Sequence, residues 1–310
     1  RNKEKKLMEQ TTIFLSQATA KAYTEGILSE IKLEIVKDEK DGGNKVEGYI
    51  TIKTDDINYT TYNITAKATT KAGKPSKSYE NLVAFMERAH SIAEVGEEEA
   101  TKVRVNGQVN PWTSFNQMGA KTHKVGYKTG FVSIISELKD PRSTFEVECF
   151  VQSVDDEFDK ETQVPTGRAI LHTLLPIYNN GIEPLDIVVP QEYAMACKQL
   201  FTQPGCQSAN IIGNIGNTKE EKKTTVEYQI GGAVTKTQTK NVNELILTHA
   251  GTMEQQYELE TIQRAIAEYD LVLESKKKRA MESNKAGGNK TVGGTTIGAS
   301  AAAGHRNFGF

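Results

Sequence analysis

The chain has 310 residues, 37% of them hydrophobic, and a formal net charge of −2. This length allows two domains with real cores, and the composition lies outside the range of disordered chains. The near-zero charge excludes a global basic field, so any nucleic acid must be bound by a local patch.

Cysteine usage and hydropathy indicate the compartment. Cys149, Cys197 and Cys206 form neither a CxxC pair nor an even set, which argues against a disulfide framework and a zinc ribbon. No apolar run approaches the roughly 18 residues of a transmembrane helix. We therefore expect a cytoplasmic protein with no membrane partner.

Residues 26–140 follow one strand and helix pattern. Segments rich in Ile, Thr and Tyr alternate apolar with polar side chains, which is typical of strands. The turn Asp41-Gly42-Gly43-Asn44 predicts a hairpin, and Ser78 can cap a helix. The expected order is three strands, a helix and two strands, over 26–37, 46–53, 58–69, 78–95, 101–109 and 131–138.

The same succession returns after Asp140-Pro141. The expected segments are 144–154, 167–177, 183–189, a helix over 193–200, and strands over 207–214, 224–230 and 243–249. Three strands, one helix and two strands is the order of an OB-fold, a small Greek-key barrel.

The expected fold class is mainly β with short helices: two tandem OB-fold-like Greek-key barrels, then a C-terminal helix and a disordered tail. The tail is predicted because its Gly, Ala and Ser cannot bury enough surface to offset chain entropy. The expected units are an N-terminal arm (1–25), a first OB-like domain (26–140), a second OB-like domain (141–252), the helix (253–282) and the Gly-rich tail (283–310).

The C-terminal helix carries a stripe of apolar residues at alternating gaps of three and four, which places them on one face. The stripe is Leu259, Ile262, Ile266, Tyr269 and Leu273. It can pack against the chain's own barrels, or it can mediate self-association. The pattern leaves both alternatives open.

The stretch from Thr101 to Phe115 is the strongest candidate binding element. Val103 and Val105 alternate with basic residues, which predicts a strand with one buried face and one basic, wet face. Trp112 and Phe115 follow. Cations beside exposed aromatics suit single-stranded nucleic acid. The alternative is a half-buried strand with solvated lysines and a tryptophan in the core.

Catalytic motifs are missing from the sequence. There is no HExxH, no GxSxG and no Walker A motif, since Gly73-Lys74 is followed by Pro75. The five histidines show no ligand spacing. We expect no enzyme, no cofactor and no metal site.

The segments TKVRVNGQV (101–109) and GRAILHTLLPIYNNGIEPLDIVVPQE (167–192) give the chain a family resemblance. Over residues 26–250 it resembles OB-fold single-stranded DNA-binding proteins of the diverged bacteriophage or mobile-element type. The resemblance implies non-sequence-specific binding of single-stranded DNA during replication or recombination, in the cytoplasm of a bacterial host. It also implies stacking aromatics and phosphate-tracking cations at Tyr49, Lys53, Tyr59, Lys67, Lys102, Arg104, Trp112, Phe115, Lys124, Tyr127 and Lys128.

Two features depart from that family. Its bacterial members end in an acidic tip that recruits replication proteins, whereas this chain ends in Phe310 and carries Lys285, Lys290 and Arg306 in its tail. The tail has therefore lost this recruitment or itself touches nucleic acid. The first strand of the second domain is acidic on its exposed face, so DNA contacts there are expected only from Arg168 and His172.

Other functions fit the same sequence. A β-rich phage structural or assembly protein, from a virion or tail, would have similar Thr-rich strands and Gly turns, and would form rings or tubes without DNA. A weaker alternative is an adaptor whose barrels bind peptides.

Overall fold

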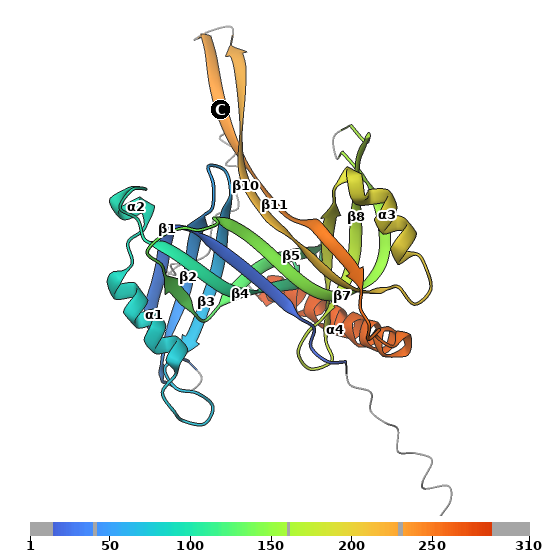
Figure 1. The fold of residues 1–310 in the computed structure, drawn as a ribbon, viewed down its shortest axis with the longest axis horizontal. Helices are drawn as coiled ribbons and strands as arrows, with labels where there is room; N and C mark the ends of the chain where they lie inside the picture. Colours follow the sequence, from blue (N-terminus) through green and yellow to red (C-terminus); the bar gives the residue numbers. More distant parts are fainter. Residues whose placement is uncertain (1–14, 40–41, 160–161, 229–231, 287–310) are drawn as a thin grey trace, which may run out of the picture.

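The computed structural model describes residues 15–39, 42–159, 162–228 and 232–286. The predicted tail beyond residue 286 and the first 14 residues of the predicted arm lie outside the described residues. Two β-barrels lie side by side, and one long helix, α4 (Leu259–Ala286), runs below both of them (Figure 1). None of the helices in the described ranges is long and apolar enough to cross a membrane.

The first barrel contains five principal strands. They pair in the order β1–β2–β3–β5–β4, and β4 pairs back with β1 to close the barrel. All neighbours are antiparallel except β3 and β5, which place Tyr62 opposite Tyr127 in a parallel register. The strands are β1 (Ala20–Lys37), β2 (Asn44–Lys53), β3 (Tyr59–Lys67), β4 (Lys102–Phe115) and β5 (Lys121–Thr129), with a short β6 (Val132–Ile134) beside β4.

The helical insertion lies between β3 and β4, as the OB-fold order requires. The sequence predicts one helix over 78–95, but the structure has two, α1 (Lys77–Arg88) and α2 (Ile92–Val95). The first begins where the Ser76 hydroxyl accepts a hydrogen bond from the Tyr79 N–H. The second begins at Ser91, whose N–H donates to Glu94 in a capping box, and this new cap divides the predicted helix.

The second barrel repeats the topology. Its strands pair in the order β7–β8–β9–β11–β10, β10 pairs back with β7, and the β9–β11 pair is parallel. The predicted class, mainly β with two OB-like barrels and a C-terminal helix, is therefore confirmed. The elements are β7 (Arg142–Phe158), β8 (Pro165–Pro176), β9 (Ile182–Val189), α3 (Gln191–Phe201), β10 (Ser208–Tyr228) and β11 (Gly232–Thr252).

The last two strands extend well beyond the barrel. β10 and β11 are 21 residues each, whereas the sequence predicts short strands over 207–214, 224–230 and 243–249. They form one long hairpin that projects from the body (Figure 1). Near its base, Thr218 forms an isolated β-bridge with Asn58, so the hairpin also touches the first barrel.

A continuous sheet joins the barrels. The first part of β1, Ala20 to Glu25, pairs with β7 on one edge and with β4 on the other. The predicted arm is therefore wrong from Ala20 onward, because these residues form the shared strand. Buried hydroxyl groups stabilise this junction between the barrels. The Thr24 hydroxyl is hydrogen-bonded to the Tyr62 hydroxyl at 2.8 Å and to the Ser143 hydroxyl at 2.9 Å.

One buried carboxylate holds the link between the barrels. Glu25 is 1% exposed and accepts hydrogen bonds from the backbone N–H groups of Lys139 and Asp140, at 2.6 and 3.1 Å. Arg104 and the Tyr23 hydroxyl donate to its other oxygen. Burial alone raises the pKa of Glu25, but the donated hydrogen bonds outweigh it and lower the pKa to about 2.

This depressed pKa predicts acid sensitivity. Folding favours the ionised Glu25, so its contribution to stability is present above the ordinary pKa of 4.5 and is lost as the pH falls towards 2. Glu25→Gln should lower the free energy of unfolding by about 2 kcal/mol at pH 7. This gap, the difference in free energy of unfolding between wild type and variant, should narrow at pH 3. Urea unfolding at both pH values measures this. The exposed Glu98→Gln is the control, and a gap that stays constant with pH contradicts the assignment.

The helix α4 packs on its own chain. Ile262 and Ala265 are buried with Leu174 and Ile182 of the second barrel, and Tyr269 packs at the edge of the same cluster. Most of the predicted apolar stripe is thus covered within the molecule, while Leu259 is 58% exposed. Of the two alternatives for the apolar stripe, packing against the chain's own barrels is the one seen in the structure.

Candidate nucleic-acid interface

Strand β4 carries a long polar face. Val103, Val105 and Val109 are buried inside the first barrel, so the alternate residues point outward. This confirms the alternation predicted for the strand and extends it to its end. The outward residues are Lys102, Arg104, Asn106, Gln108, Asn110 and Trp112.

Trp112 lies flat on the neighbouring strand. It is 37% exposed, and its ring covers Gly126 of β5, where an added Cβ would approach the indole to 2.9 Å. Lys124 lies directly opposite Trp112 in the β4–β5 pair. A glycine at position 126 therefore makes room for an exposed indole held beside a lysine, the combination that binds a stacked base and its phosphate.

Trp112 opens into a hollow between the barrels, which we call the Trp112 groove. Its volume is about 1130 Å³. One wall comes from β4 and β5 of the first barrel, and the other from β7, β8, β9 and β11 of the second. The lining residues are Trp112, Lys121, His123, Lys124 and Val125 on the first wall, and Gln152, Ser153, His172, Thr173, Pro184, Asp186 and Asn243 on the second.

The two walls differ in charge. Lys121 and Lys124 are exposed on the first-barrel wall and form no ion pair in the described part of the chain. On the opposite wall His172 lies between two carboxylates, 2.7 Å from Asp186 and 3.5 Å from Asp155. An anionic backbone would therefore follow the first-barrel wall.

A cluster of hydrogen-bonded side chains, which we call the polar joint, connects the first-barrel wall to the second barrel and to α4. The Thr113 hydroxyl donates to Glu183 of β9 at 3.0 Å and also contacts Tyr269 of α4 and Nδ1 of His123. Burial lowers the pKa of His123, and the charge of Lys121 adds to the effect, so this imidazole is neutral at pH 7. The joint fixes the spacing between the groove walls.

The same helix extends the basic surface. The Lys277 side chain lies against the β4–β5 turn, 3.1 Å from where a Cβ of Gly119 would be. Lys278 and Arg279 follow it and are exposed. Cations of α4 and of β5 therefore lie along one edge of the first barrel.

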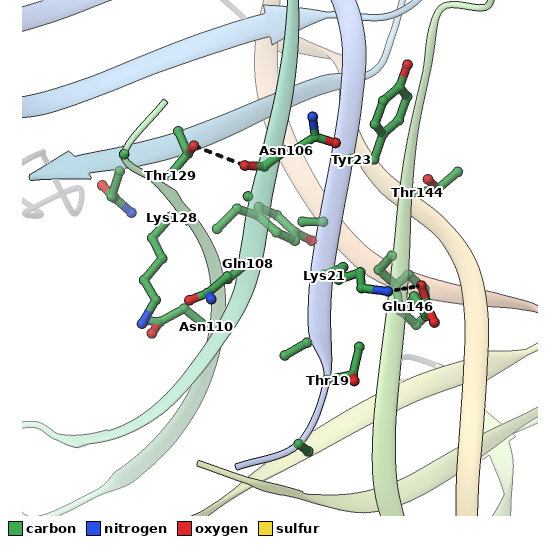
Figure 2. A pocket seen from close by; sticks show the side chains of 18 of the residues that line it. Thr19, Lys21, Tyr23, Asn106, Gln108, Asn110, Lys128, Thr129, Thr144 and Glu146 are labelled. Atoms are coloured by element: carbon green, nitrogen blue, oxygen red, sulfur yellow. Dashed lines mark hydrogen bonds and ion pairs between the residues drawn. The ribbon is translucent and has the colours of Figure 1, made fainter. Parts of the chain in front are cut away.

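A second hollow lies on the same outer face, further along β4. It has a volume of about 970 Å³ and spans strands β3, β5, β4, β1, β7 and β10. We call it the amide groove, because Asn63, Asn106, Gln108 and Asn110 line it. Figure 2 shows Gln108 and Asn110 beside Lys128, with Lys21 paired to Glu146 across the floor. Tyr23, Thr19, Thr144 and Thr129 complete its polar lining.

The structure brings several predicted site residues together. Trp112 and Lys124 share the Trp112 groove, and Lys128 lies four residues further along β5 in the amide groove. Tyr49 lies opposite Asn63, which in turn lies opposite Lys128, so Tyr49 belongs to the same cross-strand row. The sequence predicts no strand between residues 109 and 131, whereas Lys124, Tyr127 and Lys128 all belong to strand β5.

Three of the predicted contact residues are buried, face away from Trp112 or are held in an ion pair. Tyr127 is 5% exposed, with its ring 5.8 Å from that of Tyr62, so no base can stack on it. Phe115 is on the opposite face of β4 from Trp112, because it lies three positions further along the strand and successive side chains alternate between the two faces. Arg104 is engaged with the buried Glu25.

Other predicted contacts lie away from the grooves. Lys53 pairs with Glu97 at 2.7 Å, and Tyr59 lies opposite it at the start of β3. Lys67 pairs with Asp38 near the β1–β2 turn. Lys102 lies at the far end of β4 from Trp112. In the second barrel, Arg168 pairs with Glu157 and Glu244, whereas His172 does line the Trp112 groove.

Sequence reasoning missed the amides and Lys121. Continuing the even-numbered alternation of β4 past Asn106 would have found Gln108 and Asn110. The second wall of the Trp112 groove has no such signal, because only folding brings β7–β9 to face β5. Within the described residues, no three His, Cys, Asp or Glu side chains are placed to hold a metal ion.

Comparison with known proteins gives one family match. The model of the YorF family matches residues 19–282. No curated protein matches the chain in sequence.

Two solved structures resemble the fold distantly. One is a deletion mutant of the single-stranded DNA-binding protein from Thermus aquaticus, with 10% identity and a TM-score of 0.44, covering 79% of this chain and 100% of that one. Another is a replication protein A heterotrimer bound to single-stranded DNA, with 8% identity and a TM-score of 0.21, covering 83% of this chain and 70% of that one. At these TM-scores they add nothing to the topology described above.

Proposed function

The chain belongs to the YorF family, and we propose that it binds single-stranded DNA, with little dependence on sequence, in the Trp112 groove between its two barrels. The observation that carries the proposal is the exposed indole of Trp112 lying over Gly126, beside Lys124, at the mouth of that groove. An aromatic platform beside lysines suits a ligand that is both anionic and rich in flat rings.

The position of the groove and the charges on its walls support the binding of a single strand. The groove is a hollow between two barrels, with cations on one wall and His172 and Asp186 on the other. A single strand can turn its bases toward Trp112 while its phosphates follow Lys124. Lys121, whose ammonium lies 6.0 Å from the centre of the Tyr269 ring, stands at the end of the same wall. We propose that the contacts are made mainly by the first barrel, and that the second barrel supplies the facing wall.

The setting we propose is replication or recombination of a phage or mobile element, where exposed single strands need protection. The resemblance of TKVRVNGQV and of the second-barrel segment to such proteins supports this setting. The predicted recruitment of replication proteins by the C-terminal tail concerns residues outside the described ones.

The phosphate contacts can be tested through salt dependence. Lys124→Gln should weaken the binding of labelled oligo-dT and reduce the slope of log affinity against log salt by about 0.7 for one lost phosphate contact. Fluorescence anisotropy at several salt concentrations measures the slope. Lys74→Gln, an exposed lysine in the turn between β3 and α1, is the matched control and should leave the slope unchanged.

Two outcomes would count against the proposed site. If Lys124→Gln and Lys74→Gln give the same slope as wild type, the phosphates lie elsewhere. If wild type shows no affinity for any single strand at low salt, the proposed function itself is wrong.

A further inference from the structure

The amide groove is continuous with the Trp112 groove along one strand. Asn106, Gln108, Asn110 and Trp112 are alternate residues of β4 and point to the same side. Successive outward side chains on a strand are about 6.6 Å apart, roughly twice the 3.4 Å rise of stacked bases. A strand that enters at Trp112 can therefore pass along β4 in an extended form, with its bases separated.

The charge of the amide groove suits bases better than phosphates. Lys21 is paired with Glu146 at 3.0 Å, so these two charges cancel, and Lys128 is the other charged side chain of the lining. The Trp112 groove, by contrast, has two exposed lysines on its first-barrel wall.

The amides themselves are free to bind a ligand. In the part of the chain that the structure describes, the side-chain amides of Asn63, Asn106, Gln108 and Asn110 form no hydrogen bond with the protein. Each offers one acceptor and two donors in a plane. Asn and Gln pair with the adenine edge through two hydrogen bonds, one to N6 and one to N7, and unstacked bases present these edges to a protein.

We propose that the amide groove receives separated bases of the bound strand, and that Gln108 and Asn110 read their edges with a preference for adenine. This inference rests on the proposed function and adds a base preference to binding that is otherwise insensitive to sequence. Lys128, opposite Gln108 in the β4–β5 pair, holds the adjoining phosphate. Tyr23 lies in the same groove, on the neighbouring strand.

Three oligonucleotides of equal length separate base contacts from phosphate contacts. One is oligo-dT, one has adenines in place of the central thymines, and one has abasic sites there, which keep every phosphate. Wild type should bind the adenine oligonucleotide about tenfold more tightly than oligo-dT, the discrimination of one good bidentate pair. The abasic oligonucleotide should bind least tightly, because it also loses stacking on Trp112.

The variant Gln108→Leu/Asn110→Leu should bind the adenine oligonucleotide and oligo-dT equally, while its salt slope stays that of wild type. Gln117→Leu, an exposed glutamine of the β4–β5 turn outside both grooves, should retain the adenine preference. Circular dichroism melting would confirm that the variants are folded.

The inference is overturned if wild type binds the adenine oligonucleotide no more tightly than oligo-dT, or if the double variant keeps the adenine preference. In both cases binding to oligo-dT persists and the proposed function stands. If none of the three oligonucleotides binds, the proposed function fails and this inference fails with it.

Discussion

Replacing Trp112 with alanine is expected to weaken the binding of oligo-dT by about 1–3 kcal/mol, because stacking of one base on an aromatic side chain contributes that much. This corresponds to a loss of affinity of about 5- to 150-fold. The fold should be retained, since the indole is on the outer face of β4, over Gly126, and outside the buried core. Trp112→Phe should retain most of the affinity, because a smaller ring still offers a stacking face.

The control is another exposed aromatic of the first barrel. Phe131 is 50% exposed and lines neither groove, so Phe131→Ala should bind like wild type. Anisotropy titrations of both variants give the comparison directly. A Trp112→Ala variant that binds as wild type does, beside a weakened Phe131→Ala, would move the site away from the Trp112 groove.

Replacing Ile262 with alanine should lower the free energy of unfolding by about 2–5 kcal/mol, the range for removing a fully buried isoleucine side chain. Ile262 is completely buried, in the cluster that docks α4 on the second barrel. Because α4 also contacts Thr113 through Tyr269, its release should loosen the spacing of the groove walls and weaken DNA binding as well.

Leu259→Ala is the matched control for this experiment. Leu259 lies in the same stripe and is mostly exposed, so its replacement should change the stability by no more than about 0.5 kcal/mol. Urea unfolding of the two variants tests the docking of α4. Equal stabilities would contradict it. A fall in molecular size for Ile262→Ala alone, seen by light scattering, would favour the self-association alternative for the stripe.

Most strands of both barrels were predictable because they follow from local signals, but the fifth strand of the first barrel was predicted over 131–138 and is β5, Lys121–Thr129. Turns such as Asp41-Gly42-Gly43-Asn44 and the alternation of apolar residues depend on neighbours in sequence. Details that break the alternation were not predictable. In β1 the side chains of Leu28, Ile31 and Leu33 all contact the core, because a bulge between Leu28 and Glu30 shifts the register and breaks the strict alternation expected over 26–37.

The candidate site was predictable in part for a similar reason. The outward face of β4 and Trp112 are local features. Whether a cationic side chain is free to bind phosphate depends on residues that are distant in sequence. Lys53 forms an ion pair with Glu97, and Arg104 forms one with Glu25, which lies 79 residues before it. The pairing of β1 with β7, which sets the two barrels side by side, likewise has no signature in either strand alone.

The most direct test of the central claim uses the fluorescence of Trp112, the one tryptophan in the chain. Adding oligo-dT to the wild-type protein should quench it, because a base stacks on the indole. With about three phosphate contacts, a fourfold rise in salt should weaken the affinity about 20-fold. Unchanged Trp112 fluorescence with every single strand at low salt, or an affinity indifferent to salt, would contradict the account.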